Sequence, residues 1–372
     1  MPLELFERMR EHEHEQVVFC TDRSTGLRAV IAIHDTTLGP ALGGSRMWSY
    51  KSEAEAVRDV LRLSRGMTFK AAVAGLNLGG GKAVLLGDPR KDKTEAMFRS
   101  FGRFVHSLGG RYITAEDVGT SVDDMEWVRM ETPYVTGISR ALGGSGDPSP
   151  MTAWGVFVGM KACLKEVFGS EDLSGVRVAI QGLGHTGYWL ASYLHDAGVR
   201  LLVSDLDEDR VRRVVEEFGA EAVAPDAICS VEAEIFAPAA LGGVIDDESI
   251  GAMRFKIVAG SANNQLEDEN RHGAMLREKG VLYAPDFVIN SGGLINVANE
   301  LEGYNRERAK RQVETVGGIL EQIFAISRRE EIPTHEAANR AAKQRIRDMA
   351  RLHSFWLPRG EIKRKSARSA RE

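Results

Sequence analysis

Cysteine is scarce in the sequence, and long apolar runs are absent. Three cysteines, Cys20, Cys163 and Cys229, are far apart and odd in number, which argues against a disulfide framework and against a cysteine-based zinc site. No apolar stretch reaches the roughly 20 residues that span a bilayer, and the N-terminus lacks the basic and apolar regions of a secretory signal. We therefore expect a cytoplasmic protein without a membrane span.

A strong charge of either sign is also lacking. The formal net charge of 372 residues is -5, so no basic field attracts nucleic acid. Hydrophobic residues make up 43% and charged residues 27%, which is ordinary for a globular protein, and the length favours about two domains. His12 and His14 lie in a charged stretch, so we expect no metal site there. The composition predicts a two-domain globular protein.

The pattern of apolar residues predicts an α/β fold in two parts. A substrate-binding domain is expected over 1–148 and a domain of repeated βαβ units over 149–332. The segment Gly143–Pro150 (GGSGDPSP) reads as the linker between them. We expect a C-terminal helix, about 333–358, to return to the first domain, and the basic, serine-rich tail 359–372 to be disordered.

Within the first part, glycine and proline divide the expected elements. Leu27–His34 predicts a strand, and the glycine-rich Thr36–Arg46 predicts a loop. Ser52 has the position of a helix N-cap. A second loop is expected over Gly75–Gly81, followed by a short strand at Ala83–Leu86.

A dinucleotide-binding motif stands in its required context in the second part. The strand Arg177–Gln181 runs directly into the G-x-G-x-x-G sequence and a helix, and the next strand ends in Asp205. The glycines permit a tight turn, close approach of the pyrophosphate, and packing of helix on strand. A carboxylate at 205 would bind the ribose diol and repel a 2′-phosphate, so NAD is favoured over NADP. The residues expected to bind NAD here are Gly182, Leu183, Gly184, His185, Thr186, Gly187 and Asp205.

Two lysines in the first part stand in unusual settings. Lys82 follows three glycines, but a P-loop is excluded because the motif needs glycine at Leu76 and serine or threonine at Ala83. A lysine in an apolar pocket near a second cation, such as Lys70, has a lowered pKa and can exchange protons near neutral pH. Asp117 follows a strand and would complete an acid–base pair. From spacing alone, a solvated surface lysine is the more common case, and that alternative stays open.

Seven segments resemble hallmark motifs of one enzyme family, the glutamate/leucine/phenylalanine/valine dehydrogenases, and they occur in the family's order from about Leu5 to about Phe355. The resemblance implies an N-terminal substrate-binding and oligomerisation domain, a Rossmann-type doubly wound NAD-binding domain, an active site in the cleft between them, and a homo-oligomer. The segments are PALGGSRMW, GMTFK, LNLGGGKAV, YITAEDVGT, GDPSPMTAWGV, AGSANNQL and NSGGLINVANE.

The resemblance also assigns roles to individual residues. Lys70 would bind the substrate carboxylate, Lys82 would activate water and polarise the carbonyl, and Asp117 would move protons to and from the amino nitrogen. The reaction would be reversible oxidative deamination of an L-amino acid to the 2-oxo acid and ammonium, and no metal is needed because the lysines supply positive charge. Further cofactor contacts would be Ser149, Thr152, Ala239 and Asn263, and the side-chain pocket would be Leu42, Gly43, Met67, Ala115, Leu294 and Val297.

The same comparison bears on the substrate. Family members that act on glutamate carry a lysine where this chain has Leu42, and a substrate carboxylate buried there without a partner would be unfavourable. Ala115 matches members that act on leucine, whereas Leu294 matches members that act on phenylalanine. We therefore expect branched aliphatic substrates. Aromatic substrates stay open, as does a non-catalytic NAD-binding protein, although the intact lysines and aspartate argue against the latter.

Overall fold

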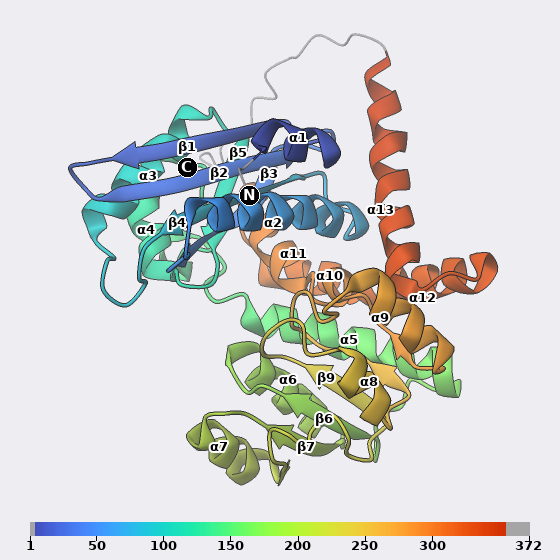
Figure 1. Ribbon diagram of the computed structural model, residues 1–372. Helices are drawn as coiled ribbons and strands as arrows, with labels where there is room; N and C mark the ends of the chain where they lie inside the picture. Colours follow the sequence, from blue (N-terminus) through green and yellow to red (C-terminus); the bar gives the residue numbers. More distant parts are fainter. Residues whose placement is uncertain (1–3, 355–372) are drawn as a thin grey trace, which may run out of the picture.

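The computed structural model describes residues 4–354, which form two α/β parts connected by the long helix α5, Ser149–Phe168 (Figure 1). The expected tail 359–372 and the last residues of the expected C-terminal helix lie outside the described residues. Among residues 4–354, no helix is both long enough and apolar enough to cross a membrane.

The N-terminal part is a mixed five-stranded sheet in the order β1-β2-β4-β3-β5. Strand β2 runs antiparallel to both β1 and β4, whereas β3 is parallel to both β4 and β5. Helices α3 (Glu95–Ser107) and α4 (Val122–Arg129) cover one face, and α2 (Glu53–Val73) covers the other. The strands are β1 Gln16–Asp22, β2 Leu27–Asp35, β3 Ala41–Trp48, β4 Gly79–Leu86 and β5 Tyr112–Glu116.

Parts of two expected loops belong to strands, and the prediction of a loop is wrong for those residues. Most of Thr36–Arg46 belongs to β3, which lies between β4 and β5, and the glycines that precede Lys82 begin β4. The glycines serve close packing rather than turning. A Cβ at Gly80 would lie 2.1 Å from the backbone nitrogen of Thr68 on α2. Glycine within a strand marks such a close backbone approach rather than a turn.

The C-terminal part is a six-stranded parallel sheet in the order β11-β10-β9-β6-β7-β8. Its first strand, β6, lies in the middle beside β9, which confirms the expected doubly wound arrangement. The strands are β6 Arg177–Gln181, β7 Arg200–Ser204, β8 Glu221–Ala222, β9 Ile235–Pro238, β10 Ile257–Val258 and β11 Leu282–Tyr283. The helices beside them are α6 His185–Asp196, α7 Glu208–Phe218, α8 Asp247–Ala252 and α9 Glu269–Glu278.

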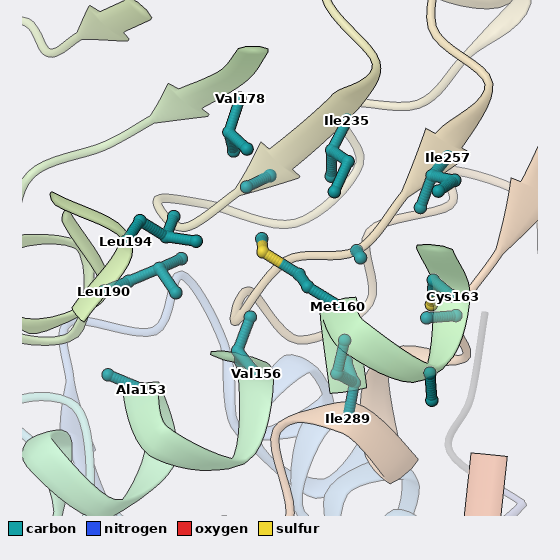
Figure 2. Packing of buried hydrophobic residues seen from close by; sticks show 14 of the residues in the cluster. Ala153, Val156, Met160, Cys163, Val178, Leu190, Leu194, Ile235, Ile257 and Ile289 are labelled. Atoms are coloured by element: carbon teal, nitrogen blue, oxygen red, sulfur yellow. The ribbon is translucent and has the colours of Figure 1, made fainter. Parts of the chain in front are cut away.

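Helix α5 forms the core of this part on one face of the sheet. Val156 and Met160 of α5 point toward Val178 and Ile235 of the central strands, with Leu190 of α6 beside them (Figure 2). These five side chains are fully buried. Burying such a side chain stabilises the fold by about 1.5–3 kcal/mol, so α5 is anchored firmly where it leaves the linker.

The last helices connect the two parts again. Helices α10 (Asp286–Ile289), α11 (Gly292–Ala298) and α12 (Arg306–Glu330) follow the second sheet, and α13 (Thr334–Ala350) packs against both α12 and α2. Arg345 of α13 donates to the carbonyls of Ala72, Gly75 and Leu76 at 2.7–3.1 Å. A cation at the C-terminal end of a helix satisfies its free carbonyls and its dipole.

The carboxylate of one glutamate, Glu300, holds the linker region through hydrogen bonds. Glu300 follows α11 and accepts hydrogen bonds from the backbone nitrogens of Gly137 and Ser145 and from the Ser145 hydroxyl, at 2.6–3.1 Å. The chain that crosses between the two parts is therefore held at one point by the second part.

A buried histidine connects the N-terminal segment to α2. The two ring nitrogens of His34 lie 2.8 Å from the Thr68 hydroxyl and 2.8 Å from the His12 carbonyl. The ring of His14 is 4.8 Å away, centroid to centroid. Burial, together with His14, lowers the pKa of His34 to about 3.

The lowered pKa of His34 predicts a loss of stability in acid. The folded pKa lies below that of the unfolded chain, so the stabilisation is complete above the unfolded value of 6.5 and declines as the pH falls toward 3. Between pH 8 and pH 5 the free energy of unfolding should fall by about 2 kcal/mol through this group. Urea denaturation of His34→Gln should show a correspondingly smaller fall. The exposed His106→Gln is the control, and equal falls in all three proteins would contradict the assignment.

Candidate active site

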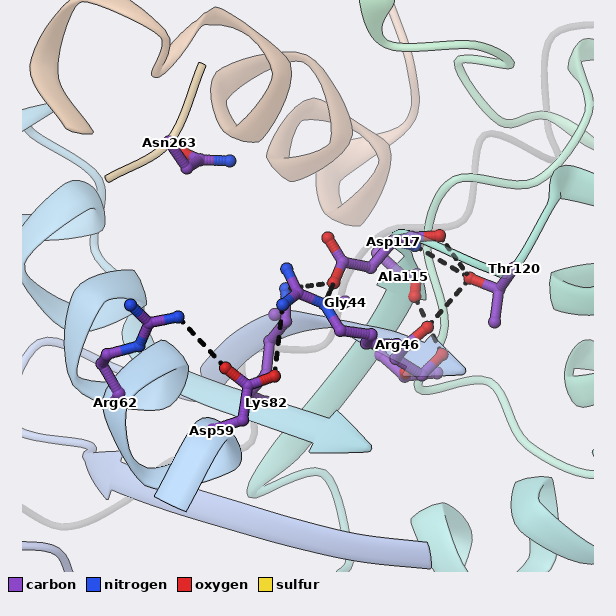
Figure 3. A network of polar contacts seen from close by, with 12 residues as sticks. Gly44, Arg46, Asp59, Arg62, Lys82, Ala115, Asp117, Thr120 and Asn263 are labelled. Carbon is purple, nitrogen blue, oxygen red and sulfur yellow. Dashed lines mark hydrogen bonds and ion pairs between the residues drawn. The ribbon is translucent and has the colours of Figure 1, made fainter. Parts of the chain in front are cut away.

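The predicted lysine and aspartate come together on the N-terminal sheet, where Lys82 in the central strand meets the residue that follows the edge strand β5. Lys82 of β4 is 5% exposed, and its Nζ lies 3.0 Å from Oδ2 of Asp117, which directly follows β5 (Figure 3). Strand β3 runs between them, and a Cβ at Gly44 would lie 2.8 Å from the Cβ of Asp117. A glycine at 44 therefore leaves room for the pair.

Burial and neighbouring charges determine the protonation of this pair. Burial lowers the pKa of Lys82, although the adjacent Asp117 opposes the shift. Burial also disfavours the ionised Asp117, but the positive charges of Lys82 and Arg46 overcome that effect and hold the carboxyl pKa below its usual range. The geometry therefore keeps a carboxylate and a readily deprotonated amine in contact.

The second lysine comes from α2 and reaches the other part of the molecule. Nζ of Lys70 lies 3.2 Å from Oδ1 of Asn263, which also accepts a bond of 2.8 Å from Nδ2 of Asn290. Burial lowers the pKa of Lys70 to about 8, while Asp286 opposes the shift. We expected Asn263 to contact the cofactor; here it contacts the lysine expected to bind the substrate. The lysines therefore lie where the two parts meet.

An apolar cluster adjoins the lysines. The expected pocket residues Leu42, Met67, Leu294 and Val297 pack in one cluster from both parts of the chain, together with Ala71, Leu78 and Ile113. A Cβ at Gly43 would lie 3.2 Å from Cγ of Met67, so that glycine borders the same space. Ala115 is 6% exposed and pairs with Gly44 across β3 and β5, two residues before Asp117.

The glycine motif forms a hollow at the end of β6. A cavity of about 460 Å³ is lined there by Asp147, Leu183, Gly184, His185, Tyr188, Trp189, Arg210 and Arg213. A Cβ at Gly184 would meet only an Arg210 nitrogen at 3.9 Å, whereas one at Gly187 would lie 2.0 Å from the Gly182 carbonyl oxygen. Gly184 thus leaves space for a ligand and Gly187 permits packing, the division of roles that a bound dinucleotide requires.

The acidic residue of the motif bonds to Leu183, which lines this hollow. Oδ2 of Asp205 accepts a bond of 2.6 Å from the backbone nitrogen of Leu183, and Oδ1 accepts one of 2.9 Å from that of Asp207. The side chain of His185 is exposed and lies 3.5 Å from the Asp147 carboxylate. Thr186 lies in the first turn of α6, whose N-terminal backbone groups favour phosphate.

The remaining expected cofactor positions lie around the same edge. The backbone nitrogen of Ala239 donates to the Gln181 carbonyl at 2.7 Å, beside the glycine loop. Ser149 begins α5, and Thr152 lies one turn later with its hydroxyl bonded to the Pro148 carbonyl at 3.2 Å. Ala239 and the glycine loop therefore lie at the carboxyl ends of β6 and β9, where ligands bind in open α/β sheets, whereas Ser149 and Thr152 lie at the start of α5.

Three acidic or basic side chains near the pair were missed from the sequence. Arg46 and Asp59 form a network with Asp117 (Figure 3). Glu116 precedes Asp117, and burial together with Asp147 and Asp117 raises its pKa to about 7. Arg46 and Glu116 lie in segments that had been singled out, but their spacing did not show which way they point.

Comparison with known proteins places this geometry in a family. Residues 14–134 match the family described as Glu/Leu/Phe/Val dehydrogenase, dimerisation domain. Residues 143–208 and 203–353 match the family described as Glutamate/Leucine/Phenylalanine/Valine dehydrogenase. The chain belongs to the glutamate/leucine/phenylalanine/valine dehydrogenase family. The chain is thus an amino acid dehydrogenase, and the resemblance inferred from the seven segments is confirmed.

Individual members of the family are similar over nearly their whole length. A leucine dehydrogenase of Geobacillus stearothermophilus is 57% identical over 98% of this chain and 100% of that protein. A phenylalanine dehydrogenase of Lysinibacillus sphaericus is 50% identical over 92% of this chain and 91% of that protein. The crystal structure of L-tryptophan dehydrogenase from Nostoc punctiforme has a TM-score of 0.82 at 46% identity, covering 93% of this chain and 100% of that one.

Substitutions of Gly184 and Gly187 should affect cofactor binding and stability separately. Gly184→Val places its side chain in the hollow, so the dissociation constant for NADH should rise about 10-fold or more, equivalent to about 1.4 kcal/mol, with little change in thermal unfolding. Gly187→Ala clashes with the backbone and should instead lower the unfolding temperature. Fluorescence titration and calorimetry measure the two effects. Equal NADH affinity in Gly184→Val and wild type would exclude this hollow as the cofactor site.

Proposed function

We propose that the protein catalyses the reversible, NAD-dependent oxidative deamination of branched-chain L-amino acids, namely leucine, valine and isoleucine. The observation that carries the proposal is the apolar cluster around Leu42 beside Lys70, Lys82 and Asp117. The cations suit a substrate with one carboxylate, and the apolar walls suit an uncharged side chain. The 57% identity to a leucine dehydrogenase supports the same substrate class.

Lys70 would bind the α-carboxylate of the substrate. Its Nζ lies where the two parts meet, 3.2 Å from Oδ1 of Asn263. A substrate oxygen would replace this amide oxygen or share the lysine with it. Pairing with the carboxylate would stabilise the protonated lysine, which burial disfavours in the free protein. The side chain of the substrate then extends toward Leu42 and Leu294.

Lys82 and Asp117 would carry out the proton transfers of the reaction. Asp117, held ionised by its cationic neighbours, takes a proton from the substrate ammonium, which frees the nitrogen lone pair. Bound NAD supplies the acceptor for the hydride of the substrate Cα. Lys82 then activates the water that attacks the resulting imine carbon, and Asp117 returns a proton to the departing amine. The sum is amino acid, NAD⁺ and water giving 2-oxo acid, ammonium, NADH and a proton.

The choice of NAD over NADP rests on Asp205. Its side chain is 12% exposed and lies at the end of β7, where a carboxylate favours a ribose diol and repels a 2′-phosphate. Arg210 lies 3.9 Å from that carboxylate and 3.2 Å from Asp207, so its charge is already balanced by two acids. We also propose a homo-oligomer, because the family matched by residues 14–134 is described as a dimerisation domain.

A substrate panel tests the proposed function. NADH production should give the highest kcat/KM with leucine, valine or isoleucine, a lower value with phenylalanine and a very low value with glutamate, and NAD should be much preferred to NADP. Ala115→Gly removes a methyl group beside Gly44 and should raise the phenylalanine-to-leucine ratio by about 1–2 kcal/mol. A wild-type preference for phenylalanine would replace the branched-chain assignment by an aromatic one.

Variants of the pair test the chemistry. Lys82→Ala and Asp117→Asn should each lower kcat by roughly 10²–10⁴, the range of general acid–base catalysis. The affinity for NADH should change little, since both residues lie on the N-terminal sheet away from the glycine motif. Near wild-type turnover in both variants would refute their assigned roles.

A further inference from the structure

An arginine bridges the catalytic carboxylate to helix α2. Nε of Arg46 donates to Oδ2 of Asp117 at 2.9 Å, and Nη1 pairs with Oδ2 of Asp59 at 3.2 Å (Figure 3). The side chains of Arg46 and Asp59 are 20% and 15% exposed, so water screens the contacts only in part. Arg46 therefore couples the reacting group to a second, remote carboxylate.

The bridge makes the two oxygens of Asp117 unequal. Oδ2 receives both Arg46 and Lys82, at 2.9 and 3.0 Å. Within residues 4–354, Oδ1 has no hydrogen-bond or ion-pair partner, and Figure 3 shows it directed away from Arg46, toward the side on which Asn263 lies. An oxygen that accepts two charge-assisted bonds is a poor site for a further proton. The network thus leaves Oδ1 for the substrate nitrogen.

Asp59 balances the charge of the arginine. It also accepts a bond of 2.7 Å from the Tyr50 hydroxyl and pairs with Arg62 at 3.2 Å through its other oxygen. Without Asp59, a partly buried guanidinium would face the pair with its charge uncompensated. Because such a charge acts strongly at low dielectric, Asp59 moderates the influence of Arg46 on the reacting groups.

We propose that Arg46 is a positioning residue for proton transfer and that Asp59 tunes it. The inference rests on the proposed function. Arg46 holds the Asp117 carboxylate ionised, with Oδ1 turned toward the substrate, and as a like charge it disfavours the protonated form of Lys82. Both effects favour the state of the pair that accepts a proton from the substrate ammonium, and Asp59 opposes both.

The pKa values of Lys82 and Asp117 shift in the directions that these charges imply. Next to burial, Asp117 is the strongest influence on the pKa of Lys82, and Arg46 lowers that pKa while Asp59 raises it. Arg46 also lowers the pKa of Asp117. Lys70 and Arg62 from α2 and Glu116 from β5 also act on the site, Arg62 through its pair with Asp59. They are unchanged in the variants below.

The pH dependence of kcat/KM for leucine, at saturating NAD, tests the proposal. Arg46→Met should lower kcat about 10- to 100-fold, because the carboxylate loses its orientation. It should also move the acid limb of the profile to higher pH by about 1–2 units, because a contacting cation is lost. Asp59→Asn should move the limb the opposite way. Arg46→Lys keeps the charge but cannot bridge both acids, so its limb should stay near the wild type with a reduced kcat.

Arg58→Met is the matched control. It removes the same charge from an exposed position of α2, the helix that carries Asp59, and its profile should superimpose on that of the wild type. Unshifted profiles, or shifts of the same sign, in Arg46→Met and Asp59→Asn would overturn the proposal. If Arg46→Met does not fold, as judged by circular dichroism and NADH binding, Asp59→Asn and Arg46→Lys decide the matter. A wild type inactive on every L-amino acid would refute the proposed function instead.

Discussion

The withdrawal of lysine side chains from water is the constraint on which the active site depends. An ammonium taken out of water is stable only beside an anion, and without one it gives up its proton. Lys82 has the Asp117 carboxylate at 3.0 Å, whereas Lys70 has an amide oxygen and a more distant Asp286. The first lysine is therefore coupled to a proton acceptor, and the second is left short of an anion. A substrate carboxylate would supply the anion that Lys70 lacks.

Close backbone packing makes this arrangement possible. Strand β4, which carries Lys82, can approach α2 because Gly80 has no side chain, and Asp117 can lie over β3 because Gly44 has none. The glycine motif of the second part follows the same principle at Gly187. In each case, a missing Cβ brings two elements close enough for polar groups from different strands to meet.

Much of the architecture could be predicted from the sequence, for identifiable reasons. The βαβ periodicity and the acid after the second strand predict a Rossmann-type sheet, and its six parallel strands agree. The N-cap at Ser52 is confirmed, since its side chain accepts from the Glu55 nitrogen. Strand β3 was missed because its glycines resemble turn residues. Arg46 and Asp59 were missed because their partnership depends on the pairing of β3 with its neighbours, which local spacing does not contain.

The contact between α13 and α2 has a consequence for how the chain is made. Arg345 closes the end of the helix that carries Lys70, yet it is synthesised 275 residues later. On the ribosome, the entire second part must emerge before α13 can cover that surface. Phe69 and Ala72, which pack against Ala342 in the finished protein, stay uncovered until then. The substrate-binding part, although first in the sequence, is thus the last to be completed, and this apolar face stays open to non-native contacts until the final helix is made.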